Sequence, residues 1–206
     1  MNQKRRGHKK TFEHLYDIAE GQGGYFTTKQ AEAAGFSEKN HAYHVGSGNW
    51  DREHRGIYRL TKFPNPERPD LILWYLWSRG RSDIPQGAYS HETALSIYEL
   101  SDVNPPKLHM TVPESFRRSS ELPKILILHR GVVHPDETEM RNRVKVTRPL
   151  KTIADLLTVR TVQMDHMRQA VREAFQRGLI TPAQLEHASR IPDEIKREIE
   201  QLRGKQ

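Results

Sequence analysis

Two neighbouring segments of the sequence decide the fold. They are Thr27-Thr28-Lys29-Gln30-Ala31-Glu32-Ala33-Ala34-Gly35-Phe36-Ser37 and Gly48-Asn49-Trp50-Asp51-Arg52-Glu53-His54-Arg55-Gly56-Ile57-Tyr58-Arg59-Leu60. In the first, Thr27 or Thr28 can cap a short helix over residues 29–34, which Gly35 closes. Ser37 can cap a third helix that runs to about Ser47, before Gly48. The pattern predicts two short helices joined by a tight turn.

The second segment predicts a β-hairpin. Trp50–Glu53 and Ile57–Leu60 have strand character, and His54-Arg55-Gly56 forms the turn between them, where glycine can supply a positive φ. Trp50 and Tyr58 are large aromatics at strand spacing, so we expect both in the core.

Upstream of these segments, apolar side chains at helical spacing predict an amphipathic helix from Thr11 to about Gln22. Gly21, Gly23 and Gly24 end it, and Tyr25-Phe26 forms a short extended link. This order of elements is typical of a winged helix-turn-helix: two helices, a glycine turn, a third helix and a basic hairpin. Residues 11–62 are therefore predicted to be a domain that binds duplex DNA.

The third helix has two distinct faces. At 100° per residue one face holds Glu38, His41, Ala42 and Val45. The opposite, candidate DNA-binding face holds Lys39, Asn40, Tyr43, Gly46 and Ser47. Asparagine can bond adenine and lysine can bond guanine, while a glycine lets the backbone approach the duplex. An ordinary polar surface is the alternative interpretation of this face.

Basic residues in the hairpin add a second set of candidate DNA contacts, made up of Arg52, His54, Arg55 and Arg59. A third set lies in the basic tail of residues 1–10, which carries Lys4, Arg5, Arg6, Lys9 and Lys10 and no acidic residue. Such charges can neutralise phosphates. The alternative for the tail is a solvated, disordered arm.

The totals exclude several classes of protein. The chain has 206 residues with 35% hydrophobic residues, a net charge of +7 and a mean hydropathy of −0.82. No apolar run of membrane-spanning length is present, and the charged N-terminus does not resemble a secretory signal. Cysteine is absent, which excludes disulfides and fits a reducing cytoplasm.

Three prolines in residues 63–69 predict a linker, followed by a second domain over residues 70–206. Strand-like runs are expected at Leu108–Val112, Ile125–His129 and Val144–Thr147. Helices are expected at 70–79, 91–100, 149–157, 162–177, after Thr181-Pro182 and, as a solvent-exposed helix, at 192–203. The fold class is therefore α+β: a winged helix-turn-helix, then a mixed α/β domain with a helical C-terminal third.

Four blocks in this order resemble the AbiEi antitoxin family. They are Phe36-Ser37 with Gly48 and His54-Arg55-Gly56-Ile57-Tyr58-Arg59-Leu60, then Gly87-Ala88-Tyr89-Ser90-His91-Glu92-Thr93-Ala94-Leu95, Lys107-Leu108-His109-Met110-Thr111-Val112-Pro113, and Val146-Thr147-Arg148-Pro149-Leu150-Lys151-Thr152-Ile153-Ala154-Asp155-Leu156. The resemblance covers roughly residues 11–180. His41 and His44 depart from it at usually apolar helix positions, as does Glu53 at a usually apolar strand position.

The resemblance implies a repressor that binds inverted repeats in its own promoter through the winged helix. It also implies that the second domain counters a nucleotidyltransferase-like toxin, as in type IV toxin–antitoxin systems, without a stable complex between the two proteins. A pure protein-interaction antitoxin, whose winged helix only holds a partner, is the alternative without DNA.

An enzyme is the alternative from another class. His129, His134, Asp136, Glu137 and Glu139, with Lys145 nearby, could form a metal-dependent nucleic-acid hydrolase, although a mobile surface turn is the alternative interpretation. Ser90-His91-Glu92 is interpreted as a helix start with Ser90 as N-cap, and His41 with His44 lacks a third zinc ligand. With no nucleotide-binding glycine motif and no HExxH, we expect no catalytic residues, metal or cofactor.

A second basic surface is expected in the C-terminal half, where residues 113–151 carry nine basic and five acidic groups. Arg141, Arg143 and Lys145 would line one side of a strand, opposite Val144 and Val146. This side could face phosphates or a partner, or it could be a solubilising outer face.

Overall fold

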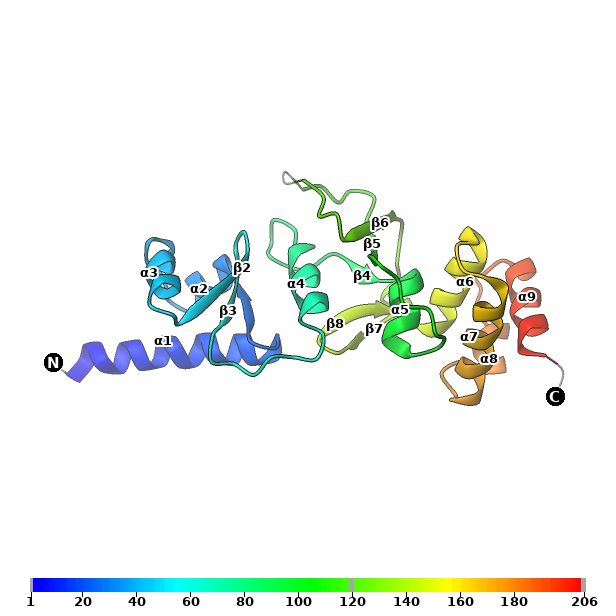
Figure 1. Cartoon of the computed structure of the whole chain (residues 1–206), viewed down its shortest axis with the longest axis horizontal. Helices are drawn as coiled ribbons and strands as arrows, with labels where there is room; N and C mark the ends of the chain where they lie inside the picture. Colours follow the sequence, from blue (N-terminus) through cyan, green and yellow to red (C-terminus); the bar gives the residue numbers. More distant parts are fainter. Residues whose placement is uncertain (1, 119–120, 205–206) are drawn as a thin grey trace. The chain divides into compact units, whose positions relative to one another are not determined.

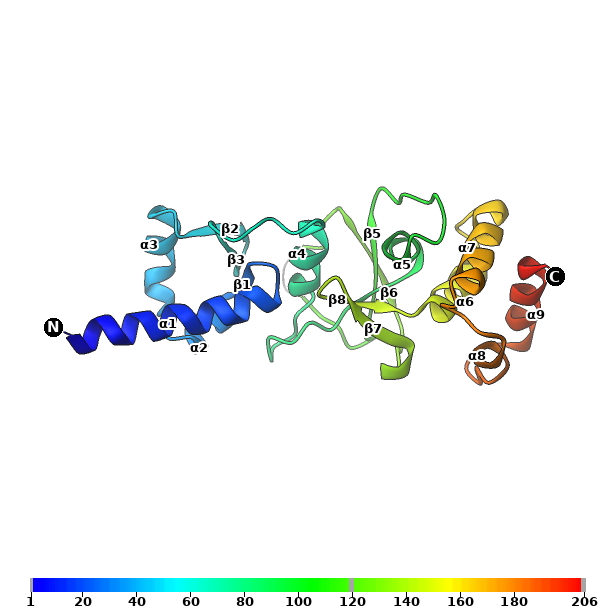
Figure 2. The ribbon, with the colours of Figure 1, turned by 90° about the horizontal axis from the view of Figure 1, so that it is seen from below.

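The computed structural model describes residues 2–118 and 121–204, and for residues 2–9 it describes the backbone only. The chain divides into two compact units, which Figures 1 and 2 show in two views. The first unit comprises Met1–Gln86 with Asn142–Val144, and the second comprises Gly87–Arg141 with Lys145–Gln206. Within the described ranges no helix combines the length and apolar character needed to cross a bilayer.

The first unit has the element order of a winged helix. Its elements are α1 (Asn2–Gly21), β1 (Tyr25–Thr27), α2 (Thr28–Ala33), the 3-10 turn η1 (Glu38–Asn40), α3 (His41–Gly46), β2 (Trp50–His54), β3 (Ile57–Leu60) and α4 (Pro69–Trp77). The three strands form an antiparallel sheet in the order β1-β3-β2. The helices and the small sheet therefore fit the predicted winged-helix class.

An aromatic core holds the first unit together. Trp50 is 1% exposed and lies edge-on to Phe26 and Phe36, with ring centroids 4.9 and 5.1 Å away. Leu15 and Ala19 of α1 pack into the same cluster. The predicted burial of Trp50 and Tyr58 is confirmed.

Three local features of the first unit differ from the predictions. Tyr25–Thr27 forms a strand rather than a link, because Phe26 pairs with Tyr58 across β1 and β3. The first helix begins at Asn2 rather than at Thr11, so the backbone of the tail is helical, whereas a disordered arm was the alternative interpretation. The third helix also starts differently from the prediction, as the 3-10 turn η1 that continues into α3.

The first unit continues past the proline-rich segment. Contacts divide the chain after Gln86 rather than within residues 63–69. Helix α4 packs on β1 and β3, and the ring of Trp74 lies 5.5 Å from that of His54. The apolar helix that the prolines introduce thus covers the winged-helix sheet instead of opening the second unit.

The second unit is a mixed sheet with helices. Its elements are β4 (Ala88–Tyr89), α5 (His91–Tyr98), β5 (Leu108–Val112), β6 (Leu126–Arg130), the 3-10 turn η2 (Pro135–Glu137), β7 (Thr138–Arg141), β8 (Val144–Thr147), α6 (Pro149–Val159), α7 (Met164–Gln176), α8 (Pro182–Glu186) and α9 (Asp193–Arg203). The strand order is β6-β5-β4-β8-β7. Strand β4 pairs antiparallel with β5 and parallel with β8, and β5 pairs parallel with β6.

The C-terminal third of the second unit is helical, as predicted. Helices α6 to α9 gather together in both views, and α9 packs on α6 and α7. The prediction that the last helix is solvent-exposed was wrong for one face. Ile195, Ile199 and Leu202 are buried because they recur at helical spacing on the side that meets α7.

Candidate nucleic-acid interface

Helices α2 and α3 follow one another in the order expected of a helix-turn-helix, and α2 begins with a capping box. The Thr27 side chain accepts a hydrogen bond from the Gln30 amide at 3.2 Å, and the Gln30 side chain accepts one from the Thr27 amide at 2.9 Å. Gly35 ends this element with a φ of +99°, a conformation that favours glycine. Thr27, one of the two predicted caps, thus starts α2.

The candidate DNA-binding face of the third helix is exposed. Lys39 and Asn40 are exposed in η1, and Tyr43 is 70% exposed in α3. Ser47 is exposed, and at Gly46 an added Cβ would have no neighbour within 4 Å. These side chains are free to meet a duplex, although their DNA contacts remain a prediction.

The inner face differs from the predicted one. Glu38 and Ala42 are exposed, whereas His41 is 2% exposed and its Nε2 lies 3.2 Å from the Phe36 carbonyl oxygen. The His44 ring stacks on Trp50 with centroids 4.5 Å apart. The two histidines at usually apolar positions therefore act as aromatic packing residues rather than as a pair of zinc ligands.

The wing is the hairpin of β2 and β3. Arg52 and Arg55 are exposed, while His54 is half-buried against Trp74. The strand pattern predicts that Arg59 presents a free guanidinium, and the structure differs on this point. Arg59 pairs with Asp51 at 2.8 Å and Glu53 at 3.1 Å, which explains the acidic residue at the usually apolar position 53.

Most side chains of the basic tail lie outside the part of the chain whose side chains the structure describes. The predicted contacts Lys4, Arg5, Arg6 and Lys9 belong to this part, while Lys10 is described and exposed. The backbone of all five is helical and continuous with α1.

The predicted second basic surface does not form on one strand. Arg141 ends β7, Arg143 lies in the turn with a φ of +67°, and Lys145 lies in β8. Val144 and Val146 are buried as expected, and Lys145 is half-buried. Arg141 lies 4.9 Å from the centre of the Tyr98 ring, which occupies its guanidinium. The prediction took β7, the turn and β8 as one strand, so the shared face was wrong.

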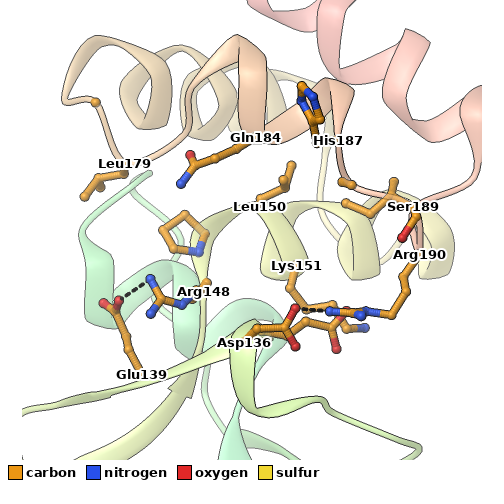
Figure 3. Close-up of a pocket in the computed structure, with 15 residues that line it drawn as sticks. Asp136, Glu139, Arg148, Leu150, Lys151, Leu179, Gln184, His187, Ser189 and Arg190 are labelled. Atoms are coloured by element: carbon orange, nitrogen blue, oxygen red, sulfur yellow. Dashed lines mark hydrogen bonds and ion pairs between the residues drawn. The ribbon is translucent and has the colours of Figure 1, made fainter.

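The acidic residues of the candidate hydrolase site line a pocket of about 590 Å³ beside the start of α6 (Figure 3). Arg190 pairs with both Asp136 and Glu137, and Arg148 pairs with Glu139 at 3.2 Å. Residues 135–137 form the 3-10 turn η2, with His134 at its N-cap. In the described ranges, no group of three or more acidic, histidine or cysteine side chains is placed to hold a metal ion.

His129 lies elsewhere, in a cluster that the sequence did not predict. It stacks on His91 with ring centroids 3.6 Å apart, and its Nε2 lies 3.1 Å from His109 Nδ1. The Ser90 hydroxyl lies 2.9 Å from His91 Nδ1 and accepts a hydrogen bond from Thr111, so its side chain does not cap α5 as expected. Three elements, α5, β5 and β6, each supply one imidazole.

Burial keeps this cluster uncharged. Burial, with the nearby His129, His109 and Lys151, lowers the pKa of His91 from 6.5 to about 3. Burial also lowers the pKa of His109, against the raising effect of Glu92, and that of His129. A single proton on one ring disfavours a proton on the others.

We expect the second unit to lose stability as pH falls from about 6.5 toward 3. The unfolded chain protonates each imidazole near pH 6.5, whereas in the folded unit the pKa of all three imidazoles is lowered, so the unfolded state binds more protons. For His91, the lower pKa in the folded chain reduces the free energy of unfolding by about 2 kcal/mol at a pH of about 5, relative to neutral pH. Thermal unfolding followed by circular dichroism at a series of pH values measures it.

His91→Asn should flatten this pH dependence by about one proton, since asparagine tolerates the φ of +53° found at this position but does not titrate. His187→Asn removes an exposed histidine of the same unit and should leave the dependence unchanged. Equal pH profiles for wild type and His91→Asn would contradict the neutral cluster.

Residues 13–61 match the model of a family described as "Transcriptional regulator, AbiEi antitoxin". The matched range covers the C-terminal part of α1 from residue 13 and all of α2, η1, α3, β2 and β3, and the resemblance predicted from the sequence is confirmed there. The crystal structure of the RV2827C protein from Mycobacterium tuberculosis aligns with 93% of this chain and 70% of its own, at 12% identity and a TM-score of 0.38. No curated protein matches the chain significantly.

Proposed function

We propose that the chain is a cytoplasmic DNA-binding repressor that acts as the antitoxin of a type IV toxin–antitoxin system. The family match over residues 13–61 supports a transcriptional regulator of antitoxin type. The observation that carries DNA binding is the exposed set of Lys39, Asn40 and Tyr43 beside an exposed basic wing. A rigid aromatic core under both elements supports their use as a docking surface.

In this proposal α3 and η1 enter the major groove of inverted repeats in the chain's own promoter. Asn40 would bond adenine and Lys39 guanine, so these residues would carry sequence discrimination. Arg52 and Arg55 of the wing and the cations of residues 4–10 would contact phosphates, which fix position without specifying sequence.

We expect Lys39→Ala and Asn40→Ala each to reduce discrimination between promoter and random DNA by about 1–3 kcal/mol, because each would lose a base contact. Mobility shifts with the DNA upstream of the gene and with a random duplex measure the ratio of affinities. Lys62→Ala, which removes an exposed cation outside the third helix, should lower both affinities and keep their ratio. Unchanged discrimination in both α3-face variants would remove this helix as the recognition element.

The antitoxin half of the proposal assigns neutralisation to the second unit. The functional partner would be a nucleotidyltransferase-like toxin, countered without a stable complex. Co-expression of a nucleotidyltransferase encoded next to the gene should stop growth, and the full chain should restore it. Rescue by residues 1–86 alone would refute the assignment to the second unit.

A further inference from the structure

The loop of residues 78–86, which follows α4, folds back on the wing and on the start of α2. Its own backbone is closed by hydrogen bonds from Gly80 N to Ile84 O at 2.9 Å and from Gln86 N to Ser78 O at 3.2 Å. It lies outside the range matched by the family model, which ends at residue 61. The sequence of this loop has no helical or strand periodicity, so it does not predict that the loop belongs to the winged helix.

Arg79 fastens this loop to the wing turn. Its side chain is 11% exposed, and Nη2 donates to the Gly56 carbonyl at 3.0 Å while Nη1 donates to the Leu76 carbonyl at 3.0 Å. Its Nε lies 3.0 Å from Asp83 Oδ1. A planar guanidinium can satisfy these three directions at once, which a lysine cannot. An added Cβ at Gly56 would lie 2.9 Å from Arg79 Nη2, so a side chain at this position would displace the guanidinium.

Asp83 carries the connection on to α2. Its Oδ2 accepts a hydrogen bond from the hydroxyl of Thr27, the residue that caps α2. The Thr28 amide in turn donates to the Gly56 carbonyl at 3.1 Å. The wing turn, the cap of the helix-turn-helix and the 78–86 loop therefore form one hydrogen-bonded network through the Arg79–Asp83 ion pair, both of whose side chains are largely buried.

Between these two residues the loop presents a cation outward. Arg81 is exposed, and its carbonyl accepts a hydrogen bond from Lys29 Nζ at 2.6 Å, which brings a second exposed cation to the same place. Arg55 is exposed at the wing turn that Arg79 holds. The one acidic side chain of the loop, Asp83, is turned inward to Arg79 and Thr27.

We propose that the 78–86 loop is part of the DNA interface: Arg79 and Asp83 are positioning residues that set the wing turn against α2, and Arg81 contacts a phosphate beside the wing. This inference rests on the proposed function of the first unit. It extends the interface beyond the helix-turn-helix and wing to a loop that follows α4.

Two variants of the full chain test the two roles. Arg81→Gln removes one phosphate contact, so the slope of log affinity against log salt should become shallower by about 1. Affinity for promoter DNA and for a labelled random duplex should fall alike, by roughly three- to tenfold. Arg197→Gln removes an equal charge from an exposed position of α9 and should change neither quantity.

Asp83→Asn separates positioning from charge by the sign of its effect. Loss of a negative charge near DNA should by itself tighten binding, whereas loss of the ion pair to Arg79 should weaken it because the wing turn is released. Asparagine tolerates the φ of +64° at this position. We expect weaker binding to both DNAs, while Glu67→Gln, a charge-matched change at an exposed position outside the recognition helix and the wing, should not weaken it.

Binding of Asp83→Asn as tight as wild type would overturn the positioning role, and an unchanged salt slope in Arg81→Gln would overturn the phosphate contact. Arg81 is on the surface, so its variant decides the contact even if Asp83→Asn unfolds. If wild type itself shows no salt-dependent binding to either DNA, the proposed function fails first, and this result is distinct from failure of the loop alone.

Discussion

Replacing Trp50 by alanine is expected to unfold the first unit and abolish DNA binding. The Trp50 ring is 1% exposed and meets aromatic rings on several sides, including Phe26, Phe36 and His44. Removal of a buried tryptophan costs about 3–5 kcal/mol, which is comparable with the whole stability of a small domain, about 5–15 kcal/mol. Because α3 and the wing rest on this ring, neither surface would keep its geometry.

All three tryptophans lie in the first unit, so fluorescence of Trp74 and Trp77 reports its unfolding in the variant. Urea titration and mobility shifts measure the two effects. Trp50→Phe is the matched control. It keeps an aromatic ring and removes an indole N–H that is buried without a hydrogen-bond partner, so the loss should be much smaller. Wild-type stability in Trp50→Ala would contradict the central role of this ring.

Deleting residues 2–10 is expected to weaken binding to promoter and random DNA alike. Five cations are lost, and phosphate contacts carry no sequence information. The slope of log affinity against log salt should become shallower by up to about 4–5 if all five neutralise phosphates. The described core of α1 begins at Leu15, so the winged helix itself should stay folded.

A second variant separates charge from helix length. Changing Lys4, Arg5, Arg6, Lys9 and Lys10 together to glutamine keeps the residues of the helix but removes the charges. It should reproduce the shallower slope of the deletion. If the deletion changes the slope and the glutamine variant does not, the helix rather than its charge acts on DNA. If neither changes it, the tail takes no part in binding.

Short-range patterns in the sequence determined the helices and the β-hairpin of the first unit and several elements of the second unit. Strands Leu108–Val112 and Val144–Thr147 have the predicted bounds, and Thr27 is one of the two predicted caps of α2. These features depend on near neighbours in the chain: alternation of side chains, capping hydroxyls and glycines at positive φ. Such rules need no knowledge of what packs against the segment.

Only the tertiary structure decided which contacts form between segments that are far apart in the sequence. Strand β4 has two residues and β1 three, and strands that short exist only because a partner strand lies beside them. His91, His109 and His129 meet because α5, β5 and β6 pack together, and the Arg79–Asp83 pair reaches the wing because α4 folds onto β1 and β3. Contacts over such separations depend on burial and on the meeting of whole elements, which no local pattern encodes.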